Sequence, residues 1–142
     1  MEIDKLYFLH ARLNQKLFKG KLEAVIIRTF CDYEEDIEAQ FESCLDPYVI
    51  WFNTRFWEDE FDPLDDVYIA TILLHEMIHQ YNHQRGIEDI DQYTVRHNAA
   101  FKKAAAAHGM TLDGYNLTPE TEKLIQKELE AYEQLQSIKW RP

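Results

Sequence analysis

Residues 66–83 read DVYIATILLHEMIHQYNH, and they form a long segment of helical pattern around which the other segments can pack. Asp65 or Asp66 can cap a helix here, and Gly86 is suited to end it after about residue 85. Apolar residues recur along the stretch and give the helix a surface to bury: Ile69, Ile72, Leu73 and Met77. The sequence therefore predicts a central helix around which the rest of the chain packs.

The same stretch contains a His-Glu-x-x-His pattern. His75 and His79 are four residues apart, so on a helix they project from one face and can bind one metal ion. Glu76 is rotated from His75 by about 100° and is a poorer ligand, but it can reach a water molecule at the metal. In this pattern the ion is zinc (Zn²⁺) and the glutamate is the general base of a hydrolysis, so we predict that role for Glu76.

A catalytic zinc site has three protein ligands and an open position. His83 lies about 12 Å of helix rise beyond His75, so one ion cannot bind both. His97 follows a loop that contains Gly86 and begins the next predicted helix, where the chain can return to the first one. We therefore predict His97 as the third ligand, and the intervening acidic loop offers the alternatives Glu88, Asp89 and Asp91.

The remaining segments predict an α+β arrangement of a small sheet and several helices. Asp46-Pro47 is a turn signal that favours a hairpin of the second and third strands. The last helix should carry one apolar stripe of Leu124, Ile125, Leu129, Tyr132 and Leu135. We expect helices over about 3–18, 97–109 and 119–138, strands over 22–30, 39–44 and 48–53, and an acidic loop over 87–93.

Length and composition favour one domain. The 142 residues are 46% hydrophobic, which is enough for a real core. We expect a single domain over 1–142, with a core over 1–115 and an amphipathic helix after it. No apolar run approaches the ~20 residues of a membrane span, and the first residues lack the basic and apolar start of a secretory signal. These features predict a cytoplasmic protein without a membrane partner.

The charge of the chain is concentrated in one segment. The net charge is −11, and residues 31–66 hold thirteen acidic residues against Arg55 alone. The negative electrostatic potential of this segment opposes nonspecific binding of nucleic-acid phosphates. Cys31 and Cys44 form no CxxC pattern, which excludes a zinc ribbon, and we expect two unpaired thiols that are buried or half-buried.

Three segments together resemble one protein family. Residues 13–22 (LNQKLFKGKL) are similar to an opening helix that ends in "N…LFxGxL" before a strand. Residues 73–80 (LLHEMIHQ) and 97–101 (HNAAF) are similar to a metal-binding helix "LLHEMIHA" and to a segment "HGxxF" with a third histidine. In order and spacing these segments resemble the Spartan-related SprT-like zinc metallopeptidases, over roughly residues 1–110.

The resemblance implies a zinc peptidase that acts on protein or peptide substrates. His75, His79 and His97 would be the ligands and Glu76 the catalytic base. The implied fold is zincin-like, with a small antiparallel or mixed sheet packed on the site helix. Asn98 departs from the family's glycine, and the chain carries no C-terminal zinc ribbon. Many members carry a zinc ribbon or a DNA-binding tail, so the resemblance allows a nucleic-acid partner, but the acidic segment and the lack of a ribbon oppose one here.

Two other functions share these residues. One is a zinc-stabilised binding or regulatory module with little catalysis, for which a fourth protein ligand would be expected. The other is a zinc hydrolase of non-peptide amides, for which a closed small pocket would be expected. Tyr93, Arg96 and Tyr115 are candidates for stabilising an oxyanion by position alone. The sequence leaves the substrate and the oligomeric state open.

Overall fold

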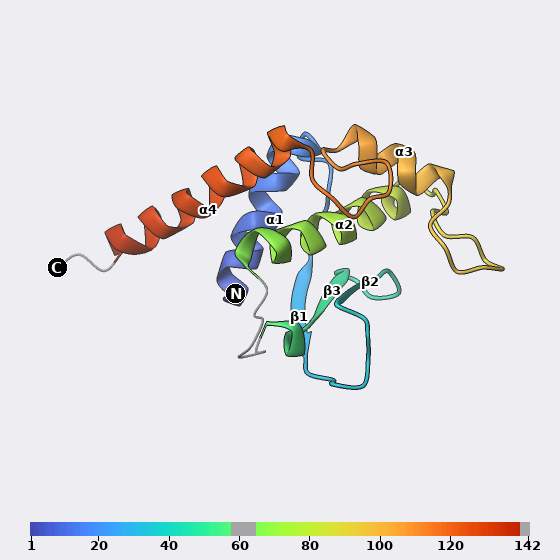
Figure 1. The fold of residues 1–142 in the computed structure, drawn as a ribbon, viewed down its shortest axis with the longest axis horizontal. Helices are drawn as coiled ribbons and strands as arrows, with labels where there is room; N and C mark the ends of the chain where they lie inside the picture. The colour runs from blue at the N-terminus through green and yellow to red at the C-terminus, as the bar shows by residue number, and fades with distance from the viewer. Residues whose placement is uncertain (58–64, 140–142) are drawn as a thin grey trace.

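The computed structural model describes residues 1–57 and 65–139 and has an α+β fold, as predicted. In the described residues, four α-helices lie to one side of a small sheet, and a 3₁₀ turn, η1, follows the last strand (Figure 1). In chain order the elements are α1 (Ile3–Leu17), β1 (Ile26–Phe30), β2 (Ala39–Glu42), β3 (Val49–Asn53), η1 (Thr54–Phe56), α2 (Asp66–Gln84), α3 (Ala99–Ala107) and α4 (Pro119–Lys139).

The sheet is mixed, with the strand order β1-β3-β2. β3 pairs in parallel with β1 and antiparallel with β2. The predicted hairpin of β2 and β3 is confirmed, and the Asp46-Pro47 peptide in its turn is cis. The sheet is thus a hairpin to which β1 adds on one side, so β2 lies at the other edge.

The first strand is shorter than the segment 22–30 that the sequence predicted. β1 begins only at Ile26, whose N–H donates to the carbonyl of Tyr48. Before it, Asn14 binds both backbone groups of Leu22, and Gln84 binds the N–H of Glu23. Because side chains of α1 and α2 satisfy this backbone, the segment has no need of a neighbouring strand.

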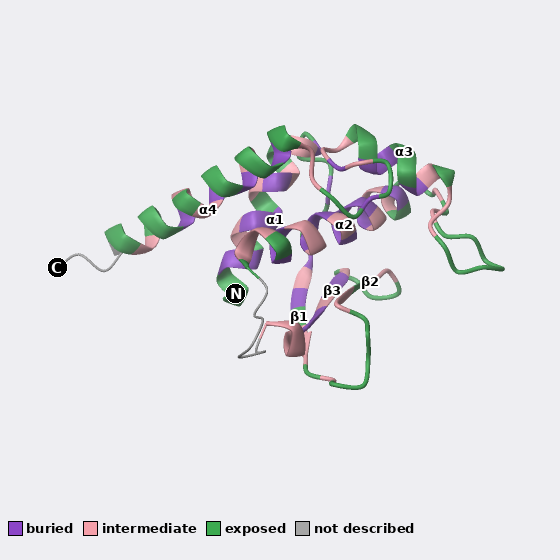
Figure 2. Ribbon diagram, in the orientation of Figure 1, coloured by how far each residue is buried: buried purple, intermediate pink, exposed green. Residues whose placement is uncertain are grey.

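The elements form three tiers (Figure 1). The sheet lies below α2 in this view, α1 crosses beside α2, and α3 and the first half of α4 lie above them. α2 is buried on most of its surface (Figure 2), and its fully buried residues include Leu73, Leu74, Met77 and Ile78. A helix that is apolar around most of its circumference belongs in the middle of a protein.

Both ends of α2 follow the sequence prediction. The Asp65 carboxylate accepts the N–H of Tyr68 as an N-cap. Gly86 has a φ of +70°, and the next residue, Ile87, donates its N–H to the carbonyl of Asn82. A left-handed residue directly after the helix lets the chain turn back at once, which matters for the placement of His97.

The predicted stripe of the last helix is covered over most of its length but not at its end. Leu135 and Ile138 are 52% and 64% exposed, whereas the carboxylate of Glu128 is buried and binds Arg12 of α1. Figure 1 shows that the second half of α4 runs out beyond the other described elements. Of the five stripe residues, Leu124, Ile125, Leu129 and Tyr132 are buried or half-buried, and Leu135 is exposed.

Cys31 and Cys44 are free thiols, as expected, but both are exposed rather than buried. Residues 58–64 of the acidic segment lie outside the part of the chain that the structure describes. Within the described part, no helix is both long enough and apolar enough to cross a membrane.

Candidate metal centre

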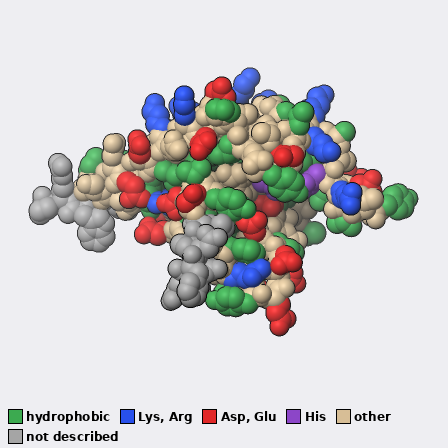
Figure 3. Space-filling model, viewed as in Figure 1, with side chains coloured by type: hydrophobic (Ala, Val, Ile, Leu, Met, Phe, Trp, Pro, Cys, Tyr) green, Lys and Arg blue, Asp and Glu red, His purple; other side chains and the backbone are tan. Residues whose placement is uncertain are grey.

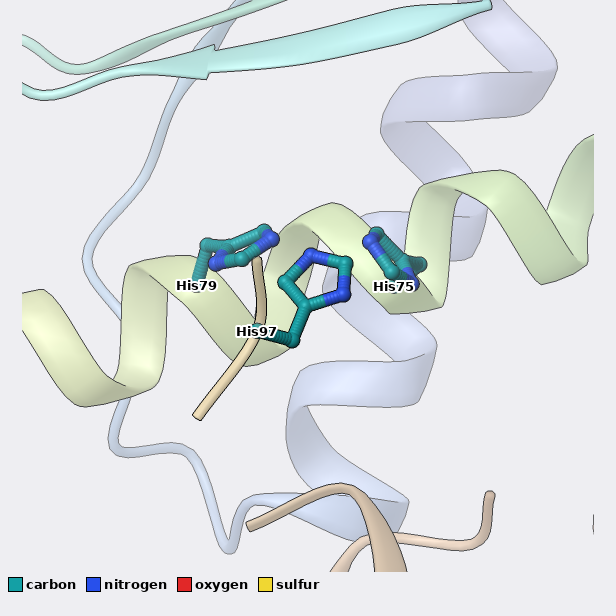
Figure 4. Close-up of side chains that lie close together, drawn as sticks. All are labelled: His75, His79 and His97. Atoms are coloured by element: carbon teal, nitrogen blue, oxygen red, sulfur yellow. The ribbon is translucent and has the colours of Figure 1, made fainter. Parts of the chain in front are cut away.

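Three histidines from two parts of the chain face one another (Figure 4). His75 and His79 project from the same side of α2, and His97 approaches them from the segment before α3. The loop after Gly86 brings His97 there, because Asn98 donates its N–H to the carbonyl of Asp89, and Ile90 forms a β-bridge with His97. Asn98 then starts α3 by accepting the N–H of Phe101.

The three rings form a compact group. One ligand atom from each of His75, His79 and His97 lies within 4.8 Å of the others, close enough to share a metal ion. Their ring centroids are 4.9 to 5.1 Å apart. The structure therefore brings together the three residues that the sequence singled out as ligands.

Two of the rings are oriented by partners behind them. His75 donates its Nδ1 proton to the carbonyl oxygen of Gly114 at 2.6 Å, and His79 donates its own to the Asp89 carboxylate at 2.7 Å. Because a carbonyl can only accept, the proton of a neutral His75 is on Nδ1 and the free lone pair is on Nε2. Metal-binding histidines are held in this way, with the second nitrogen bonded to an oxygen.

Asp89 is this partner rather than an alternative third ligand. Its carboxylate also accepts a hydrogen bond from Asn82 at 3.1 Å, which fixes it behind His79. Of the other two alternatives, Glu88 contacts Gln92, and Asp91 accepts the N–H groups of Tyr93 and Thr94. Among the described residues, none of the three acids joins the histidine group.

His97 is held mainly by ring contacts. Its ring stacks on Phe101 at 4.0 Å between centroids, and Tyr115 lies with its hydroxyl 3.2 Å from Nδ1. Phe101 is fully buried and also contacts His75 and His79. One aromatic side chain thus supports all three histidines.

The three oxyanion candidates are placed very differently. Tyr115 lies at the histidines, with its ring against His75. Tyr93 is 97% exposed near the tip of the loop, and Arg96 lines a separate cavity on another side of His97. Only Tyr115 among these three lines a cavity together with Glu76.

The surroundings set the protonation of the histidines. Burial lowers the pKa of His75 to about 4 and also lowers the pKa of His97, so both are neutral at pH 7. Burial opposes protonation of His79 as well, but the Asp89 hydrogen bond and the charge of Glu76 outweigh it and raise the pKa. His79 is therefore the most basic of the three.

Glu76 is buried beside the histidine group, only 7% exposed. Burial raises its pKa to about 7, against the opposing effects of His79 and of a backbone hydrogen bond from Phe41 in β2. A carboxyl group with a pKa near the working pH can both accept and return a proton.

The histidines and Glu76 lie at the floor of an open cleft of about 680 Å³. One wall is β2 with the residues around it, and the other is the acidic loop after α2. Figure 3 shows histidine side chains at the surface of this face, bordered by hydrophobic and acidic ones. His83 lies at the edge of the cleft beside Tyr48 and outside the histidine group.

The carbonyl of Gly114 is the contact that sequence reasoning missed, because a backbone carbonyl has no side-chain signature.

Comparison with known proteins adds no assignment: no protein-family model matches the chain, and a search of curated proteins gives no significant match.

Proposed function

We propose that this chain is a zinc-dependent peptidase of the SprT-like type with a zincin-like fold. The observation that carries the proposal is the arrangement of His75, His79 and His97 around one point, with the buried carboxyl group of Glu76 beside them. The three quoted sequence segments support the same family.

The donor set fits zinc. Three imidazole nitrogens are ligands that zinc commonly takes at catalytic sites, with a further position left for water or substrate. At His75 and His79 the Nδ1 atom is occupied by an oxygen partner, which leaves Nε2 for the ion. When bound, zinc lowers the pKa of water and polarises a substrate carbonyl.

Glu76 performs the proton transfers in the proposed reaction. Its carboxylate takes a proton from the attacking water and gives it to the nitrogen of the amine that leaves. Burial keeps this carboxyl group from bulk water, and the backbone hydrogen bond from Phe41 holds it at the cleft floor. Tyr115, whose hydroxyl is 3.2 Å from Nδ1 of His97, steadies that ring.

The position of β2 favours a peptide as the substrate. Asn53 of β3 donates to the carbonyl of Glu38, so by strand alternation Ala39 and Phe41 turn their backbone groups away from β3. The Phe41 N–H binds Glu76, which leaves the Phe41 carbonyl and the two backbone groups of Ala39 for a ligand. These two residues line the cleft. An extended peptide can add to such an edge by main-chain hydrogen bonds and lie across the histidines.

The alternative functions receive less support. In residues 1–57 and 65–139 the histidine group has three members and no fourth protein ligand, unlike a structural zinc site. The cleft is large and open rather than a closed pocket for a small amide.

The test is the variant Glu76→Gln, which keeps the shape of the side chain but cannot accept the proton. We expect hydrolysis of unfolded casein to fall by about 10² to 10⁴-fold, while one equivalent of zinc per chain remains by elemental analysis. Glu130→Gln, the same change at an exposed position of α4, should keep both the casein hydrolysis and the bound zinc. Undiminished cleavage by Glu76→Gln would refute the proposal.

A further inference from the structure

A second cavity opens beside Glu76, between the start of β2 and the first half of α2. We call it the side pocket. It has a volume of about 220 Å³ and adjoins the metal centre, because His75 and Glu76 line both it and the main cleft. The residues that shape it are Glu38, Ala39, Tyr68, Ile72 and Tyr115.

Glu38 gives the side pocket its chemical character. Two acidic side chains line the side pocket: Glu76 on the side of the metal centre, and Glu38 at the opposite end, among Ala39, Tyr68 and Ile72. The hydroxyl of Tyr68 donates to its carboxylate at 3.3 Å. No ion pair is found between Glu38 and a lysine or arginine in the part of the chain that the structure describes.

The half-buried state of Glu38 has a consequence for ligands. Burial raises the pKa of Glu38, against the opposing effect of the Tyr68 hydrogen bond. The carboxylate is therefore partly desolvated, and none of the ion pairs in the described residues compensates its charge. A cationic group that enters the side pocket would supply the missing charge. Hydrogen bonds to ionised groups are stronger than those between neutral groups.

The direction of β2 decides which part of a peptide reaches the side pocket. β2 runs from Ala39 to Glu42, and the side pocket lies at its beginning. Antiparallel pairing is slightly more stable per residue than parallel pairing. A peptide paired antiparallel with β2 has its C-terminal half at the beginning of β2, and therefore at the side pocket.

We propose that the side pocket binds the side chain that follows the cleaved peptide bond, and that Glu38 selects lysine or arginine there. This inference rests on the proposed peptidase function and names its substrate class: peptides with a basic residue on the C-terminal side of the cleaved bond.

The test compares two fluorescence-quenched peptides that differ at one position, lysine in one and norleucine in the other. Norleucine keeps the aliphatic chain and lacks the ammonium group. Mass spectrometry of the products locates the cleaved bond. We expect the lysine peptide to be cleaved before its lysine, with a kcat/KM about tenfold above that of the norleucine peptide.

Two variants assign the preference to Glu38. In Glu38→Gln the ratio of the two kcat/KM values should fall to within about twofold of unity. Glu42→Gln is the matched control, because Glu42 lies on the same strand but binds the indole nitrogen of Trp51, and the tenfold ratio should persist. Equal cleavage of both peptides by the wild type, or a preference on the N-terminal side of the bond, would overturn the inference and leave the peptidase proposal standing.

A binding measurement separates the two proposals if neither peptide is cleaved. Fluorescence anisotropy of the labelled peptides on the zinc-loaded wild type then gives their Kd values. Tighter binding of the lysine peptide that is lost in Glu38→Gln would support the side pocket while refuting hydrolysis. Equal Kd values would overturn the inference.

Discussion

His75 and His79 are positioned by the helix that carries them, whereas His97 depends on a loop and on the contacts of its ring. In the sequence, His97 lies farther from His75 and His79 than these two lie from each other. Its removal therefore tests whether the group acts as one site.

We expect the wild type, purified without added metal, to carry one equivalent of zinc and His97→Ala to have lost most of it. Two histidines on one helix turn leave too few protein donors for a tightly held ion. Elemental analysis of both proteins measures this. His83→Ala is the control, since His83 lies outside the group, and it should retain its zinc. Equal zinc in His97→Ala and wild type would place the third ligand elsewhere.

Asp89→Asn should weaken zinc binding without abolishing it. The amide keeps the size of the carboxylate but removes the charge that makes His79 a stronger donor, a change that typically costs 10 to 100-fold in affinity. Competition with a chromogenic chelator measures the Kd. Asp91→Asn, a change in the same loop at a residue that caps backbone N–H groups, should have a much smaller effect. An unchanged Kd in Asp89→Asn would mean that its hydrogen bond does not tune the site.

The pairing of His75 with His79 could be predicted from the sequence, whereas the role of Asp89 could not. The spacing of His75 and His79 is a local property of one helix, so the sequence was enough to pair them. Asp89 is bonded to the site in a role that the sequence did not distinguish from a ligand, because ligand and partner carry the same carboxylate. A carboxylate ten residues after His79, beyond a helix-ending glycine, was the available signal.

Among the elements, the loop between α3 and α4 supports the metal centre, because Gly114 contacts His75 and Tyr115 contacts His97. A β-bridge between Met110 and Leu117 closes this loop, and Gly114 at its tip has a φ of +75°. A Cβ atom built there would lie 2.2 Å from the ring of Phe101. The carbonyl that orients His75 is thus brought close by the absence of a side chain.

Gly114→Ala should therefore destabilise the protein and weaken zinc binding together. The left-handed φ costs about 1 kcal/mol for alanine, and overpacking against Phe101 adds about 1 to 3 kcal/mol. Gly20→Ala is the matched control, because Gly20 has a φ of +73° with nothing within 4 Å, and it should show only the first cost. Urea denaturation and a zinc titration measure the two effects. Equal behaviour of both variants would contradict the close approach.

Elements were predicted well where local signals decide them and less well where distant segments do. Asp65 and Gly86 mark both ends of α2 in the sequence. The length of β1 depends on Asn14 and Gln84, which lie on other elements, and the exposure of Leu135 depends on where the rest of the molecule ends. Neither can be obtained from a local pattern.

At the scale of the whole molecule, α1 and α2 are joined by a buried polar contact as well as by apolar packing. His10 is 5% exposed, and its Nε2 lies 3.0 Å from the side-chain oxygen of Gln80. The amide nitrogen of Gln80 donates elsewhere, to Glu23 and Gln84, so its oxygen accepts from a neutral His10. Burial lowers the pKa of His10 below the ordinary 6.5.

This contact predicts a pH dependence of stability. The unfolded chain binds a proton at His10 near pH 6.5 and the folded chain only at lower pH. Acid therefore favours unfolding, and the contribution of His10 to stability falls as the pH drops below 6.5, by at most about 1.4 kcal/mol per pH unit. His10→Gln can still donate to Gln80 but does not titrate.

The measurement is urea denaturation of wild type and His10→Gln, both metal-free, between pH 5 and pH 8. The stability of the wild type relative to the variant should decrease toward pH 5. The other histidines are common to both proteins and cancel in the difference. A difference that does not change with pH would show that His10 is not held neutral by burial.

The partners behind the three histidines have a consequence for how an ion would leave. They are a backbone carbonyl, a carboxylate and the phenol of Tyr115, which is 61% exposed. The carboxylate makes His79 the strongest donor, and the exposed phenol gives His97 the weakest support. In a zinc-loaded protein, His97 would then be the first ring to dissociate, and His75 and His79 alone would hold the ion only weakly, so a competing ligand would reach it from the side of His97.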